Sequence, residues 1–201
     1  MNLHAPGLED DLVRLEPFEQ GHVTFLKESG AVEAMWAWMP DIPTGKSADA
    51  YAAHVFSRQK RGELVGFTMF RQSDNAFAGV VDFDYISRTH RRVRITNFWY
   101  THEARGKGYF QASQALLIRR ALDWGAKRVG WMIPSDARSA IRAIERLGAK
   151  EEGLMRSYCR LAGGGWADVA LHVMLRDEAE LASQRIQTAR ELRRDAGSDI
   201  S

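Results

Sequence analysis

Between residues 99 and 110 the chain has the sequence WYTHEARGKGYF. The pattern runs from the end of a strand, through a glycine-containing turn, into the start of a helix. A helix start exposes unpaired backbone N–H groups at the positive end of the helix dipole. Gly106 and Gly108 let a phosphate approach the main chain, and Arg105 and Lys107 add positive charge at the rim. The stretch therefore predicts a pyrophosphate site.

Two other phosphate-binding motifs do not match this stretch. A nucleotide-triphosphate loop requires G-x-x-x-x-G-K-[ST], but Lys107 is followed by Gly108 and no matching glycine lies upstream. A dinucleotide loop requires a third glycine, where this chain has Gln111, and a parallel βαβ unit. The glycine triplet 163–165 is typical of a hairpin turn.

Apolar periodicity predicts a mixture of helices and strands around this site. A short strand at Leu12–Leu15 precedes two helices, Phe18–Ser29 and Ala48–Arg61. An antiparallel meander of three strands then leads into two helices, separated by a strand, and a final hairpin. In chain order these segments are Leu64–Phe70, Ala76–Ile86, Arg92–Tyr100, Gly108–Trp124, Arg128–Ile133, a helix capped by Asp136 that ends at Gly148, Gly153–Leu161 and Trp166–Leu175.

We expect one domain over residues 1–176, followed by a charged helical extension and a disordered tail over residues 177–201. Acid–base pairs at helical spacing support a solvated helix in this extension. We interpret it as an appendage or as the contact of a homodimer. Its large apolar residues that could anchor it are Leu181, Ile186 and Leu192.

Composition limits the classes of function. The formal net charge is only +2, which favours no nucleic-acid partner. Cys159 is the only cysteine, so the chain has neither an intrachain disulfide nor a multi-cysteine zinc site. The acidic start of the chain differs from a signal peptide, and no apolar run reaches the ~18 residues of a membrane span. We therefore expect a cytoplasmic protein with no metal and no membrane partner.

Further residues carry a family resemblance. Ala143–Ala149 has the sequence AIERLGA, and Glu152 and Gly153 follow it. With Arg105–Gly108 and the order of elements, these residues resemble the GCN5-related N-acetyltransferases (GNAT), most closely the bacterial RimJ/RimL-type branch of ribosomal-protein N-acetyltransferases. The resemblance covers residues 12–175. It implies an α/β (α+β) acyl-CoA N-acyltransferase fold: a mixed, mostly antiparallel central sheet flanked by helices, with a splay between strands four and five.

The resemblance also implies where acetyl-CoA binds. Strands four and five correspond to Val93–Tyr100 and Arg128–Ile133. The pantetheine arm is expected between them, hydrogen-bonded to strand backbone, with the pyrophosphate on the N–H groups of the glycine loop. The implied cofactor residues are Phe98, Trp99, Tyr100, Arg105, Gly106, Lys107, Gly108, Tyr109, Phe110 and Ser139.

The usual catalytic residues of the family are not visible. Ala137 stands where an Asn commonly opens the second helix, and Ile144 stands where a Tyr often supplies the acid. Ala140 occupies the position of an alternative Ser, and Arg94 replaces a frequent acidic residue at the start of strand four. The acid and base must therefore come from other positions.

An amine of pKa near 10 is almost fully protonated at neutral pH, so attack on a thioester requires a base or desolvation. Asp82 and Asp84 lie two apart on a predicted strand and share one face, which suits either a base or a solvated strand face. Ser139 and Tyr158, with Cys159, are candidate proton donors for the leaving thiolate. His172 suits a half-buried structural position.

Trp36, Trp38 and Met39 fall where this branch often places acceptor residues, although three large apolar groups also suit a core. The function expected is transfer of an acetyl group from acetyl-CoA to a primary amine, by direct attack in a ternary complex. The acceptor would be a protein or peptide N-terminus or a small amine. The alternative is a non-catalytic acyl-CoA-binding module on the same fold.

We predict that Gly108→Asp weakens acetyl-CoA binding at least ~100-fold, or roughly 3 kcal/mol, because it places bulk and negative charge against a phosphate. Fold stability should change far less, because Asp near a helix N-terminus is otherwise favourable. Calorimetry of acetyl-CoA and of ATP with both proteins measures this. Unchanged acetyl-CoA affinity, or a parent protein that prefers ATP, would contradict the assignment of the loop.

Overall fold

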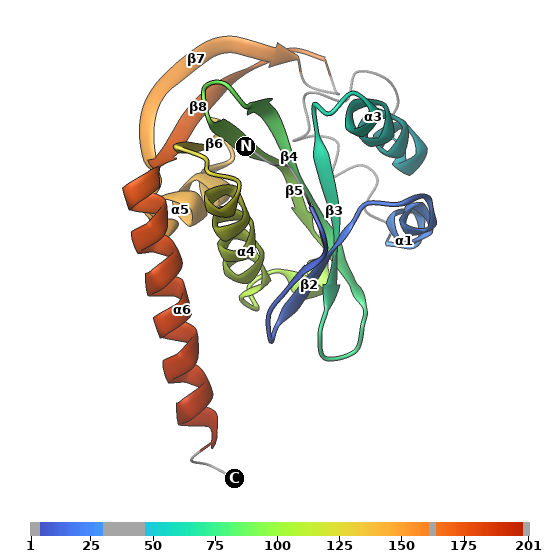
Figure 1. Cartoon of the computed structure of the whole chain (residues 1–201). Coiled ribbons are helices and arrows are strands. Elements are labelled where there is room, and N and C mark those ends of the chain that lie inside the picture. The colour runs from blue at the N-terminus through green and yellow to red at the C-terminus, as the bar shows by residue number, and fades with distance from the viewer. Residues whose placement is uncertain (1–4, 30–46, 161–163, 199–201) are drawn as a thin grey trace.

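The computed structural model describes residues 5–29, 47–160 and 164–198. Its centre is an eight-stranded sheet in the order β1-β2-β3-β4-β5-β6-β8-β7 (Figure 1). Neighbouring strands are antiparallel except for β5 and β6, which run parallel. The strands are β1 (Leu8–Glu9), β2 (Val13–Pro17), β3 (Val65–Arg71), β4 (Phe77–Ser87), β5 (Arg92–Tyr100), β6 (Arg128–Pro134), β7 (Lys150–Arg160) and β8 (Trp166–Leu175).

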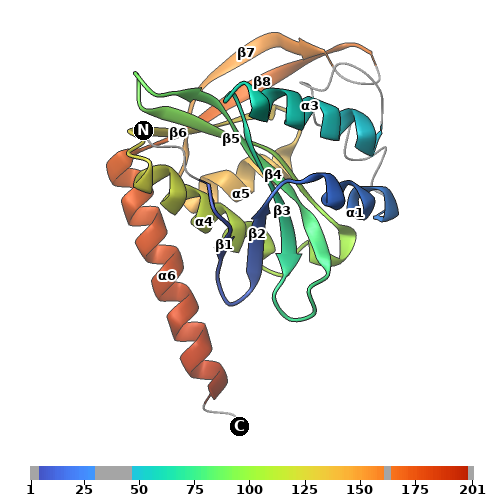
Figure 2. The ribbon, with the colours of Figure 1, turned by 45° about the vertical axis from the view of Figure 1, so that its right-hand side comes forward.

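Helices cover both faces of this sheet. The helical segments are η1 (Gln20–His22), α1 (Val23–Glu28), α3 (Ala48–Lys60), η2 (His102–Ala104), α4 (Tyr109–Asp123), α5 (Arg138–Leu147) and α6 (Arg176–Ser198). The first two α-helices, α1 and α3, lie on one face, and α4, α5 and α6 lie on the other (Figures 1 and 2). The mixed, mostly antiparallel sheet flanked by helices is therefore confirmed.

The bounds of most elements agree closely with the sequence prediction, and two differ. The strand predicted from Gly153 begins at Lys150, because residues 150 and 151 already pair with β8. Asp136 does not cap α5. The helix begins one residue later than an Asp136 cap would place it, with Ala137 as the N-cap residue and no side-chain cap.

Two apolar clusters hold the layers together. The larger one joins α4, α5 and α6 to the sheet and includes Val81 and Phe83 of β4. The smaller one joins α1 and α3 to the opposite face and includes Val80. Alternate residues of β4 thus face opposite layers, as expected for a strand that is buried on both sides. Asp82 and Asp84 share the α3 face, because they contact Tyr51 and Arg58 of α3 respectively.

The parallel strands β5 and β6 separate soon after they begin. They pair only at Arg92 with Arg128, Val93 with Val129, and Arg94 with Gly130. Beyond that point β6 remains paired with β8 as far as Pro134. The other strand, β5, remains beside β4, with a register shift near Asn97, whose φ of 50° is left-handed. The splay between strands four and five of the family is therefore present.

The C-terminal helix α6 is partly integrated into the core, although its far end extends beyond the body of the protein (Figure 2). Ala179 and Ala182 are buried in the larger cluster, and Ile186 packs against it as predicted. The prediction for Leu181 was wrong: it is 52% exposed. Small residues anchor the helix because they allow it to approach α4 closely. The side chain of Leu192 lies outside the described residues.

No helix in the described ranges is both long and apolar enough to cross a membrane.

We predict that Ala182→Asp lowers the free energy of unfolding by at least about 2 kcal/mol, because it buries a charge against α4. Its neighbour Leu181→Asp is the matched control and should change stability by less than about 0.5 kcal/mol, because that position is exposed. Urea unfolding measures both. Equal, small effects would show that α6 is only an appendage.

Candidate active site

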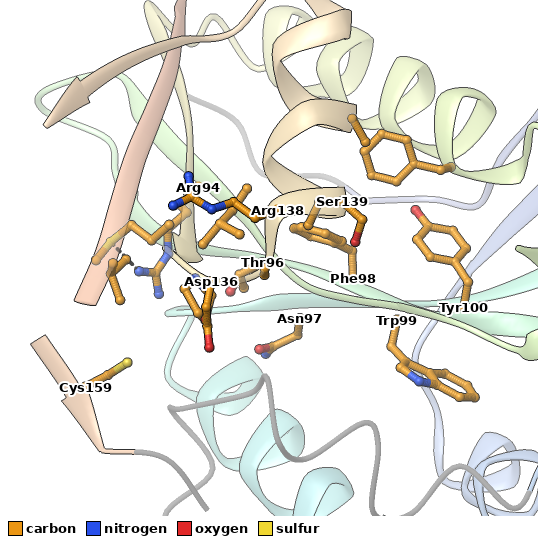
Figure 3. Close-up of a pocket in the computed structure, with 18 of the residues that line it drawn as sticks. Arg94, Thr96, Asn97, Phe98, Trp99, Tyr100, Asp136, Arg138, Ser139 and Cys159 are labelled. Carbon is orange, nitrogen blue, oxygen red and sulfur yellow. Dashed lines mark hydrogen bonds between the residues drawn. The ribbon is translucent and has the colours of Figure 1, made fainter. Parts of the chain in front are cut away.

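A cavity of about 660 Å³ occupies the region where β5 and β6 separate (Figure 3). Its walls come from the end of β5, the end of β6, the N-terminal turn of α5 and the bulged part of β7. Most of its lining is apolar, including Phe98, Phe110, Ile133 and Pro134. A largely apolar cavity with a few convergent polar groups is the usual form of a small-molecule site.

The glycine loop joins this cavity to the start of α4. Gly106 and Gly108 have φ of 75° and 88°, which residues with a side chain rarely adopt. A Cβ added at Gly106 meets nothing within 4 Å, and one at Gly108 meets only the Leu12 side chain at 3.5 Å. The backbone conformation therefore requires glycine, and the space beside both residues is open to a ligand.

The N–H groups at the start of α4 are available to an anion. The first hydrogen bond of the helix runs from Ala112 N to Gly108 O, so the N–H groups of residues 109–111 have no acceptor within the helix. Arg105 Nε donates to Tyr100 O at 3.2 Å, which ties the loop to the end of β5. Lys107 is exposed at the rim. These features fit the pyrophosphate of a coenzyme A derivative.

Aromatic rings form the wall between β5 and α4. The Phe110 ring packs against Phe98 and Tyr100 with centroid distances of 6.0 and 5.9 Å. Burial raises the pKa of Tyr100 to about 12, and its hydroxyl is 2.7 Å from Ser113 Oγ, so Tyr100 keeps its proton at neutral pH. Tyr109 is buried in the core. It can therefore offer the ligand its N–H but not its side chain.

Asp82 lies directly behind the cavity wall. It has no exposed surface, and Tyr51 Oη donates to its two carboxylate oxygens at 3.0 and 3.2 Å. Asn97 Nδ2 donates to Asp82 at 2.8 Å, and Asn97 itself lines the cavity. Burial raises the pKa of Asp82 to about 7, although the hydrogen bonds from Asn97 and Tyr51 oppose the rise. A carboxyl group that titrates near neutrality beside a cavity is a candidate base.

Asp84 is occupied by positive partners. Its two oxygens accept from Arg94 Nε and from a terminal nitrogen of Arg94, both at 2.6 Å, and Arg58 lies 3.5 Å away. The Arg94 guanidinium also lies 4.1 Å from the centre of the Tyr85 ring. Arg94, the departure from the family pattern, is therefore balanced by a buried carboxylate. Asp84 acts as its counter-ion.

Some of the other predicted site residues line the cavity, and others do not. Ser139 of α5, Tyr158 of β7 and the buried Cys159 line the cavity. Trp99 also borders it and packs against Phe77 on the α3 face, at a centroid distance of 6.3 Å. Trp36, Trp38 and Met39 lie outside the described residues.

His172 is fully buried rather than half-buried, and it is not among the residues that line the cavity. Its Nε2 is 3.6 Å from a Glu145 carboxylate oxygen and 3.9 Å from one of Glu151. Among the described residues, no group of three or more His, Cys, Asp or Glu side chains could hold a metal ion.

Sequence reasoning missed Asn97 and Tyr51, which hold Asp82. The signal for Asn97 was a polar amide within an otherwise apolar stretch of strand, next to aromatic residues. Nothing in the sequence pointed to a role for Tyr51 at the site, because a Tyr on a helix most often packs in the hydrophobic core.

The splayed parallel strands, the cavity between them and the anion-binding helix start define an acyl-CoA N-acyltransferase architecture. A family model described as an acetyltransferase (GNAT) domain matches residues 13–150. The chain therefore belongs to the GNAT acetyltransferase family. No curated protein matches the chain.

Solved structures share the fold at low sequence identity. A GCN5-related N-acetyltransferase from Brucella melitensis is 21% identical, with a TM-score of 0.80, over 92% of this chain and 85% of that chain. Mycobacterium smegmatis RimJ in complex with CoA-disulfide is 17% identical, with a TM-score of 0.76, over 91% and 92% of the two chains. Vibrio cholerae spermidine N-acetyltransferase with CoA and spermine is 16% identical, with a TM-score of 0.72, over 85% and 99%.

The left-handed φ of Gly108 alters one expectation: Gly108→Asp will lose stability, by about 1 kcal/mol or more, because Asp must adopt a strained conformation. Gly108→Asn is the matched control, since it has the same shape and a similar strain without the charge. We expect Asn to weaken acetyl-CoA binding about tenfold and Asp at least about 100-fold. Calorimetry of both variants separates the two contributions. Equal losses would assign the effect to bulk and strain alone.

Proposed function

We propose that this protein transfers the acetyl group of acetyl-CoA to a primary amine, by direct attack in a ternary complex. The observation that carries this proposal is the cavity between β5 and β6, which is continuous with the residues around the glycine loop. Acetyl-CoA supplies an acetyl group activated as a thioester. The protein must bind acetyl-CoA, position the amine, accept a proton from the amine and supply a proton to the departing thiolate.

The residues of the cavity suit the binding of acetyl-CoA. Exposed backbone at the separated edge of β5, from Phe98 to Tyr100, can pair with the amide groups of the pantetheine arm. The N–H groups from Gly106 to Phe110 would hold the pyrophosphate, with Lys107 at the rim. The N–H of Arg105, also expected there from the sequence, donates instead to His102 O at 3.2 Å. Ser139, in the first turn of α5, lies at the same cavity and can donate to the arm.

We assign Asp82 as the group that accepts a proton from the amine. Its carboxylate lies one side chain behind the cavity surface, so we place one bridging water beside Asn97 between it and the amine. A carboxyl group accepts a proton only in its ionised form. Because the pKa of Asp82 is about 7, the fraction of protein molecules in which Asp82 is ionised rises as the pH rises through neutrality.

The departing thiolate requires little help, because a thiol of pKa near 8.5 is a fair leaving group. Ser139 of α5 and Tyr158 of β7 both line the cavity and both carry a hydroxyl. Either can donate the proton. Loss of either donor should therefore slow the reaction without abolishing it.

The acceptor is a primary amine of one of two classes. Similar folds include an acetyltransferase from Salmonella typhimurium that modifies the N-terminal serine of ribosomal protein L7/L12, and the spermidine enzyme. A panel of peptides with free N-termini and of polyamines, assayed for release of free CoA, identifies the class. Binding of acetyl-CoA without turnover across the panel would favour the non-catalytic module, which the full burial of Asp82 also permits.

We predict that Asp82→Asn lowers kcat about 100-fold or more while the affinity for acetyl-CoA stays within about twofold. The increase of kcat through neutral pH should also disappear, because Asn cannot accept the proton. The measurement is a profile of kcat between about pH 5.5 and 9.

Asp84→Asn is the matched control. It leaves the Arg94 charge without its carboxylate, so the variant should lose stability. An increase of kcat with pH should remain but move to lower pH, because the Asp84 charge helps to raise the pKa of Asp82. If Asp82→Asn keeps the parent's profile, Asp82 is not the base. If only Asp84→Asn loses the profile, the two roles are reversed.

A further inference from the structure

Two consecutive residues of α4 hold the two strands that separate. Tyr100 Oη, at the far end of β5, is 2.7 Å from Ser113 Oγ. Trp131 Nε1, on β6, donates to Gln114 Oε1 at 3.0 Å. Trp131 directly follows Gly130, where the pairing between β5 and β6 stops. A single turn of one helix thus contacts both sides of the splay.

These contacts are well defined. Ser113, Gln114 and Trp131 have no exposed surface, and Tyr100 is 9% exposed. Ser113 Oγ donates to Phe110 O at 3.0 Å, so the Tyr100 hydroxyl must be the donor in its bond to Ser113. The raised pKa of Tyr100 means that it retains this proton throughout the neutral range.

Separated parallel strands need such a support. The facing edges of β5 and β6 beyond Arg94 and Gly130 carry backbone groups without partners in the other strand, and such edges tend to pair. Their separation must therefore be fixed from outside the sheet. The aromatic packing of Phe110 against β5 contributes, but it gives no contact of defined length to β6.

We propose that Ser113 and Gln114 form a brace that sets the width of the cleft and so positions coenzyme A. This inference rests on the proposed function, because it assigns the cleft between β5 and β6 to that ligand. The four residues Tyr100, Ser113, Gln114 and Trp131 are positioning residues and do not touch the reacting atoms. The brace acts equally on the bound and reacting states, so it should affect binding more than the chemical step.

The test uses Tyr100→Phe, Gln114→Met and the double variant. Tyr100→Phe removes the hydroxyl that bonds Ser113. Gln114→Met removes the bond to Trp131 of β6 and also the side-chain interaction of Gln114 with Tyr100. Thr68→Val is the matched control. Thr68 is also fully buried, and its hydroxyl lies 2.9 Å from His22 Nδ1, but it faces η1 away from the cleft. Calorimetry with free CoA, thermal unfolding and steady-state kinetics are measured for each protein.

We expect each single variant to bind CoA about fivefold more weakly, the factor that one lost hydrogen bond of ordinary strength corresponds to. The KM for acetyl-CoA should rise by the same factor while kcat stays within about twofold. Thr68→Val should lose similar stability and keep the parent's CoA affinity.

Brace variants that lose stability like Thr68→Val but bind CoA like the parent would overturn the proposal. If Gln114→Met fails to fold, Tyr100→Phe alone decides, because it removes only one hydroxyl. A parent protein that binds no CoA would instead overturn the proposed function.

Discussion

The whole site depends on the strand pairing of β6, which is much more extensive with one neighbouring strand than with the other. This strand pairs along its full length with β8 but at only three positions with β5. Beyond these three positions β6 stays with β8 and β5 stays with β4, so the two parallel strands diverge and leave an opening within the sheet. Edges of this kind are normally closed by pairing or covered by other elements. Here one turn of α4 fixes them apart, and the same helix presents its N-terminal N–H groups to the opening.

A second consequence of the divergence is the placement of charge. Near the point where β5 leaves β6, Arg94 and Asp84 form a buried pair, and Asp82 lies two residues before Asp84 in β4. The guanidinium pairs with Asp84, whereas the hydrogen bonds to Asp82 within the described part of the chain come from two neutral donors, Tyr51 and Asn97. Two carboxylates of the same strand thus have different surroundings: Asp84 is paired with a guanidinium, and burial raises the pKa of Asp82 to about 7.

Much of the fold could be predicted from the sequence, because local patterns encode it. Arg92–Tyr100 and Trp166–Leu175 agree with their strands, and Gly108 and Gly125 bound the helix that follows the loop. The loop could be recognised because few residues other than glycine adopt the left-handed backbone conformation found at this helix start. The acidic pair was placed on one face from its spacing alone, which the contacts with α3 confirm.

The rest required contacts between distant segments. The pairing of Asp84 with Arg94 depends on the register of β4 against β5, and that register shifts at Asn97. Tyr51 reaches Asp82 across 31 residues of sequence. Helix α6 looked like an appendage because Ala179 and Ala182 carry little hydrophobic signal, although close packing of small residues is what buries them. Such features follow from tertiary geometry, which a pattern of residue types does not specify.

The central claim is that the opening between β5 and β6 holds coenzyme A. A crystal structure of the protein with CoA tests it most directly. We expect the pantetheine arm to lie between the two strands, hydrogen-bonded to β5 between Phe98 and Tyr100, with the pyrophosphate on the N–H groups from Gly106 to Phe110. CoA bound elsewhere on the protein, or a structure in which β5 and β6 pair along their whole length, would contradict the account.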